Sequence, residues 1–148
     1  MEKLTGPRLF TLDEAQRMLP LVRSIVRDII ERYAAFKDRV EFYRAGQEAL
    51  KQGFPPPDGW HRERVAREID ALKDDVMAVV GELTELGADL RDYEEGMVDF
   101  PARLGEDIVY LSWKLGEDKV GHWRPLDGTD GPRRALEEIH EEAGGAPF

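Results

Sequence analysis

The sequence contains no cysteine, which excludes disulfide bonds, thiolate metal sites and cysteine nucleophiles. It also has no apolar run that approaches the roughly 18 residues of a membrane-spanning helix. The opening stretch, MEKLTGPRLF, lacks the apolar core of a signal peptide. We therefore expect a cytoplasmic protein with no membrane partner.

Clustered positive charge is also scarce. Residues 1–64 hold 12 basic and 10 acidic side chains, residues 65–148 hold 9 and 21, and the net charge is −10. A surface that follows nucleic-acid phosphates needs concentrated Lys and Arg, so we do not expect nucleic acid as a partner. Phosphate loops, dinucleotide fingerprints, nucleophile elbows and zincin helices are absent as well, which removes support from several enzyme classes.

Helical periodicity fills the first half of the chain. Thr11 and Glu14 have the spacing of a capping box, which predicts a helix start. From Leu12 to Tyr43, apolar residues recur at spacings of 3 and 4, as in a coiled-coil seam. Pro20 is expected to kink this helix or to restart it, because it lacks an amide proton.

A second helix repeats the same spacing. The proline-rich loop of residues 53–60 precedes it, its seam runs from Val65 to Leu86, and Gly87 is placed to end it in a left-handed conformation. A loop this short makes the two helices antiparallel neighbours. The prediction for residues 9–86 is a long, coiled-coil-like helical hairpin.

The apolar stripe on these helices is wider than a two-helix hairpin covers by itself. The C-terminal sheet of the same chain, a second copy or a foreign helix could cover the remaining face. We expect a homo-oligomer, most simply a dimer, or another helical protein as the partner. The seam residues expected at that interface are Val22, Val26, Ile29, Val76 and Val79.

After Gly87 the pattern changes to β-branched and aromatic runs separated by glycine turns. Residues 88–126 are predicted to form a three- to four-stranded antiparallel meander, with Val109, Leu111 and Trp113 facing the helices. The tetrapeptide Leu-Gly-Glu-Asp occurs at residues 104–107 and 115–118, where we interpret it as two turns with solvated acids. Residues 127–148 are predicted to be an acidic helix or tail. The whole chain, residues 1–148, is expected to be one α+β domain.

The strongest chemical constellation lies on or beside the meander. Asp99, Glu117 and His122 supply two carboxylates and an imidazole, ligands that suit a divalent metal such as Zn, Mn or non-haem Fe. The alternative is structural: Asp99 bonds local backbone, Glu117 is a turn acid and His122 is an ordinary strand residue. Order along the chain does not decide between the two, because a metal site requires that the three side chains converge.

Four segments carry a family resemblance: FTLDEAQRMLPLVR, GMVDFPA, VYLSWKLGED and GHWRPLDG, in that order. Together they resemble a bacterial domain-of-unknown-function family numbered 2203, over about residues 9–133. The resemblance implies an uncharacterised prokaryotic protein with a helical hairpin and a small sheet, and it supplies no activity or catalytic residue. The family's blocks read Cys-Trp-x-x-Gly-Glu and Trp-His, where this chain has Ser112-Trp113 and Trp123-Arg124. A metal ligand at those positions would therefore be lost, or moved to His122.

Two functions follow from these patterns. The first is a non-enzymatic protein–protein interaction or assembly module that acts through the helical hairpin, because the seams are continuous and catalytic motifs are absent. The alternative is a metal-binding protein or metal-dependent enzyme with its site on the meander.

Overall fold

A computed structural model describes residues 8–126 and 132–136 of the chain. Helix α1 spans Leu12–Lys51, and helix α2 spans Arg62–Leu86 and packs against it. The strands are β1 (Asp89–Asp92), β2 (Met97–Leu104), β3 (Asp107–Lys114), β4 (His122–Pro125) and β5 (Arg134–Ala135). The strands lie in sequence order in one antiparallel sheet, so the predicted α+β class and antiparallel hairpin are confirmed.

Both predicted helix ends are present. The Thr11 hydroxyl accepts a hydrogen bond from the amide of Glu14 (3.1 Å), and the Glu14 carboxylate accepts one from the amide of Thr11 (2.9 Å). Gly87 closes α2 with a φ of 98°, a left-handed conformation that glycine adopts without strain. Helix α1 does not restart at Pro20 but continues through it. Leu19 and Val22 on either side are buried in the core, and this packing offsets the missing hydrogen bond.

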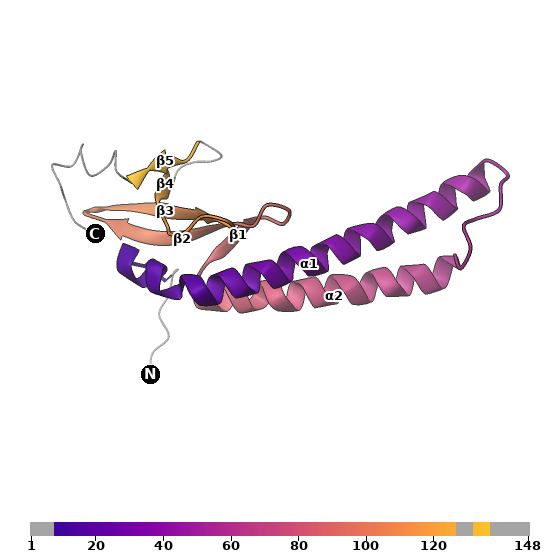
Figure 1. The fold of residues 1–148 in the computed structure, drawn as a ribbon, viewed down its shortest axis with the longest axis horizontal. Helices are drawn as coiled ribbons and strands as arrows, with labels where there is room; N and C mark the ends of the chain where they lie inside the picture. Colours follow the sequence, from indigo (N-terminus) through magenta and orange to yellow (C-terminus); the bar gives the residue numbers. More distant parts are fainter. Residues whose placement is uncertain (1–7, 127–131, 137–148) are drawn as a thin grey trace.

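The sheet lies against one end of the hairpin, and the opposite end projects beyond it (Figure 1). Helix-facing residues of β2 and β3 are paired across the strands, Val98 with Trp113 and Phe100 with Leu111. All four are fully buried and belong to one apolar core with the sheet end of the helices. The predicted inward orientation of Val109, Leu111 and Trp113 agrees with their burial.

The sheet is larger than the sequence predicted. It has five strands rather than three or four, because Arg134–Ala135 pairs with β4 inside the segment expected to be a tail. Phe10 adds an isolated parallel bridge to Ala102 in β2. Residues 127–131 and 137–148 of the predicted acidic tail lie outside the described residues. No helix in the described ranges combines the length and apolar character of a membrane span.

The tip of the hairpin is closed by Trp60, which ends the proline-rich loop and is buried. Its indole lies on Gly46 of α1, so close that a Cβ at Gly46 would come within 2.0 Å of the ring. Tyr43 flanks the same indole, with the ring centroids 6.0 Å apart. A glycine inside a helix is therefore required here by a contact from a distant part of the sequence.

Candidate functional site

The three residues proposed as metal ligands lie on the sheet face opposite the helices or at its margin. Asp99 pairs with Ser112, and Ser112 pairs with His122, so one cross-strand row runs over β2, β3 and β4. Because β3 lies between the other two strands, Asp99 and His122 are about 10 Å apart along the row. Glu117, in the β3–β4 connection, places its Oε2 3.8 Å from Nδ1 of His122.

Asp99 is paired with arginine. Its carboxylate is fully buried, accepts a hydrogen bond from Arg124, and lies 3.4 Å from Arg91 Nε. Burial raises the pKa of Asp99, and the two guanidinium charges only partly counter this effect. An aspartate held in this way serves as the counter-ion of two arginines.

Glu117 is also bound by an arginine. Its two carboxylate oxygens accept hydrogen bonds from Arg133 at 2.7 and 2.9 Å, and one of them accepts a third from the amide of Lys114 (3.0 Å). Partial burial alone would raise the pKa of Glu117, but the hydrogen bonds from Arg133 and Lys114 outweigh it, and the pKa is lowered.

The predicted metal ligands therefore do not converge. Across residues 8–126 and 132–136, no group of three or more His, Asp or Glu side chains could hold a metal ion. The intervening strand separates Asp99 from the other two residues, and the arginines neutralise both carboxylates. The sequence did not predict that Arg124 and Arg133 would bind these carboxylates, because each arginine is distant in sequence from its partner.

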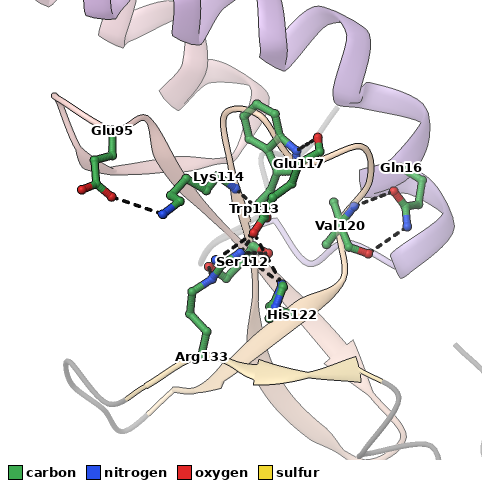
Figure 2. Close-up of polar contacts among 9 residues, drawn as sticks. All are labelled: Gln16, Glu95, Ser112, Trp113, Lys114, Glu117, Val120, His122 and Arg133. Carbon is green, nitrogen blue, oxygen red and sulfur yellow. Dashed lines mark hydrogen bonds and ion pairs between the residues drawn. The ribbon is translucent and has the colours of Figure 1, made fainter.

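Arg133 is the centre of the polar network that holds the β3–β4 connection (Figure 2). Besides Glu117, its guanidinium donates to the hydroxyl (3.0 Å) and the carbonyl (3.2 Å) of Ser112, and it lies 3.3 Å from His122 Nδ1. The indole of Trp113 donates to the carbonyl of Glu117 (3.0 Å). The network fastens β5, β3 and the connection to one another.

The same connection is fastened to α1. The side-chain amide of Gln16 donates to the carbonyl of Val120 (3.0 Å) and accepts from its amide (2.9 Å), as a neighbouring strand would (Figure 2). The two Leu-Gly-Glu-Asp copies thus differ in environment. Glu106 of the first copy is exposed in a simple β2–β3 turn and Asp107 is exposed at the start of β3, whereas Glu117 of the second is anchored.

The five residues proposed for an interface are buried inside the single chain. Their side chains are between 0% and 5% exposed. The sheet end of the molecule covers most of this seam, and a partner would find little of it at the surface. The residues expected at the interface are Val22, Val26, Ile29, Val76 and Val79; all of them stabilise the monomer fold.

Single exposed apolar side chains occur along the molecule, at Leu21, Met77, Ile108 and Leu126, but a continuous half-buried seam lies farther along the helices. We call the projecting part, residues 33–75, the distal hairpin. Beyond Ile29 the α1 seam is only half-buried, and so are Ile69 and Leu72 of α2. At the tip, Leu50 and Phe54 are 42% and 60% exposed. The half-buried seam residues of α1 are Tyr33, Phe36, Val40 and Tyr43.

A cleft of about 360 Å³ opens where the distal hairpin leaves the sheet, and we call it the Tyr33–Tyr93 cleft. It lies between α1 and the β1–β2 turn, and the rings of Tyr33 and Tyr93 are 5.1 Å apart. Lys37 and Glu94 form an ion pair across it. The cleft is lined by Ile30, Tyr33, Ala34, Lys37, Asp38, Tyr93 and Glu94.

The β1–β2 turn holds this cleft in shape. Asp92 accepts hydrogen bonds from the amides of Glu95 (2.7 Å) and Glu94 (2.8 Å), which lower the pKa of its carboxyl. Gly96 follows with a φ of 79°, and a Cβ there would lie 2.8 Å from Val26. The turn is therefore pressed directly against α1.

These features define an α+β protein in which a projecting helical hairpin is anchored by a five-stranded antiparallel sheet. The chain belongs to the family described as uncharacterized conserved protein, DUF2203, whose model matches residues 8–136. The resemblance drawn from the four sequence segments is thereby confirmed. Among curated proteins and solved structures, none matches the chain.

Proposed function

We propose that this protein is an assembly module whose distal hairpin docks a second copy of the chain. One observation carries the proposal: the hairpin projects beyond the sheet, and its apolar seam changes there from buried to half-buried (Figure 1). At the sheet end, β2 and β3 cover the seam. In the described part of the chain, no element covers its continuation in the distal hairpin.

The physical reason is the geometry of helix pairs. Two packed helices bury only the stripe between them, and the flanks of large seam residues remain in water. A second hairpin would complete a four-helix arrangement and remove these flanks from water, at about 25 cal/mol per Å². The exposed side of α1 carries alternating signs of charge, with Lys37, Glu41, Arg44 and Glu48, which favours a like surface over a strongly charged partner.

The assembly surface must be tested in the distal hairpin and not at the buried seam. A charge at Val26 or Val76 would enter the core and unfold the chain, because an unpaired buried charge costs several kcal/mol. Val40 is half-buried, so the stem of a glutamate there can lie on the seam with its carboxylate in water.

Sedimentation velocity over a concentration series tests the proposal. We expect the wild type to form a dimer and Val40→Glu to sediment as a monomer with an unchanged circular dichroism spectrum. Ala78→Glu, an exposed position on α2 outside the distal hairpin, is the matched control and should remain dimeric. A wild type that stays monomeric at every concentration would overturn the proposed function.

A further inference from the structure

We propose that the two copies cross antiparallel through α1, and that each Tyr33–Tyr93 cleft receives the guanidinium of Arg44 from the other copy. This inference rests on the proposed function and specifies its geometry. Four observations carry it: the chemistry of the cleft, the position of Arg44, the order of charges along α1, and the small residue at the floor of the cleft.

The cleft is built to attract a planar cation. The rings of Tyr33 and Tyr93, with their centroids 5.1 Å apart, line it together with the side chains of Asp38 and Glu94. A guanidinium stacks on aromatic faces and binds carboxylates at its edge, and it loses its hydration more readily than an ammonium. Lys37 already shows the preference, because its ammonium pairs with Glu94 and lies 5.8 Å from the centre of the Tyr33 ring.

Within the distal part of α1, Arg44 is the arginine available for this contact. It is exposed on the same helix and has no ion pair or hydrogen bond through its guanidinium in the described part of the chain. By contrast, Arg32 and Arg39 pair with Asp28 and Glu68 of their own chain. Arg44 is ten residues from Ala34, or about 15 Å along a helix, so it does not reach the cleft of its own chain.

When two copies of α1 lie antiparallel, the charges on this side of the helix face charges of opposite sign. Ala34, Lys37, Glu41 and Arg44 are spaced 3, 4 and 3 residues apart and share one face of the helix. A two-fold axis level with residue 39 places Arg44 of one copy opposite Ala34 of the other. It also places Lys37 opposite Glu41. Each contact occurs twice, as an isologous interface requires.

Ala34 provides the space for this contact. It lines the cleft with only a methyl group, beside the larger side chains of Tyr33 and Lys37, so a long side chain from another molecule has room at this position. Ala35, the next residue, is also exposed on the helix but does not line the cleft. The pair offers a matched comparison.

The test is the dimer dissociation constant of the full chain, measured by sedimentation for six variants. Ala34→Trp fills the cleft and should weaken the dimer at least about tenfold, since two cation–aromatic contacts and their ion pairs are lost. Ala35→Trp should leave the constant within about twofold, the scale expected for a surface substitution. Arg44→Glu should weaken the dimer like Ala34→Trp, and because Arg44 is exposed this variant remains folded. Exchanging Lys37 and Glu41 together, Lys37→Glu with Glu41→Lys, should retain more affinity than either single reversal.

The outcomes separate the two proposals. A monomeric wild type overturns the proposed function and this inference with it. A wild-type dimer that Val40→Glu dissociates, but that Ala34→Trp and Arg44→Glu leave unchanged, overturns the Arg44 contact and leaves the assembly function standing. Weakening by Ala34→Trp and Arg44→Glu but not by Ala35→Trp supports the inference.

Discussion

At the residue scale, the repeated tetrapeptide shows how environment decides the role of one side chain. Glu106 and Glu117 occupy the same place in Leu-Gly-Glu-Asp, yet only Glu117 has Arg133 and the Lys114 amide as partners. The identical sequence of the two copies therefore does not predict how much each glutamate contributes to stability. The difference arises from Arg133, which reaches Glu117 from the segment before β5.

Glu117→Gln should destabilise the protein by about 1–3 kcal/mol at neutral pH, because charged hydrogen bonds to a half-buried carboxylate are lost. The folded pKa of Glu117 lies below its unfolded value, so its contribution is present above the unfolded pKa of about 4.3 and disappears as the pH falls through the folded one. Urea unfolding from pH 7 downward should show the gap between the wild type and Glu117→Gln closing in acid. Glu106→Gln is the control and should change little at any pH; equal effects of the two substitutions would contradict the anchoring role.

At the scale of the helix, substitution of two glycines inside the hairpin by alanine is expected to change stability in opposite directions. Gly46 lies under the indole of Trp60, whereas a Cβ at Gly81 would meet no atom within 4 Å. Alanine is normally favoured over glycine inside a helix by about 1 kcal/mol. Gly81→Ala should therefore stabilise the protein by about that amount. Gly46→Ala should destabilise it by about 1–3 kcal/mol, because the tip must repack around the displaced indole.

Chemical denaturation followed by circular dichroism measures both glycine variants, at a protein concentration low enough that the chain is monomeric, so that association does not enter the comparison. A red-shifted tryptophan emission in Gly46→Ala alone would report the exposure of Trp60. If both substitutions raised stability, the close packing of Trp60 on Gly46 would be refuted.

The elements that the sequence predicted are those governed by local chemistry. The capping box at Thr11, the left-handed end at Gly87 and the alternation of Val109, Leu111 and Trp113 each depend on neighbours a few residues away. The pairing of Asp99 with Arg124, and the closure of Trp60 on Gly46, join positions whose proximity only the tertiary fold creates. For the same reason, the order of Asp99, Glu117 and His122 along the chain did not decide whether they converge, whereas the strand pairing of the described residues separates Asp99 from His122.

At the scale of the whole molecule, the core and the candidate assembly surface occupy different places. The buried cluster extends along α1 only as far as Ile29 and along α2 from Val79 to Leu83, next to the sheet. The distal hairpin adds helix-to-helix contact but few buried residues: Gly46, Trp60 and Val65 near the tip. This separation places most of the stability in the sheet end, and on the proposed function it leaves association to the projecting end.

Removal of residues 36–71 and their replacement by a short glycine-rich turn tests this separation. Arg39 bonds Glu68 and Arg32 faces Asp75, so the cut joins α1 and α2 at positions that are already level. The shortened chain keeps the buried cluster at the sheet end, and we expect it to unfold cooperatively with the near-ultraviolet signal of Trp113 retained, as a monomer at every concentration. Loss of cooperative unfolding would show that the distal hairpin is part of the stabilising core, and a persistent dimer would place the assembly surface on the sheet end.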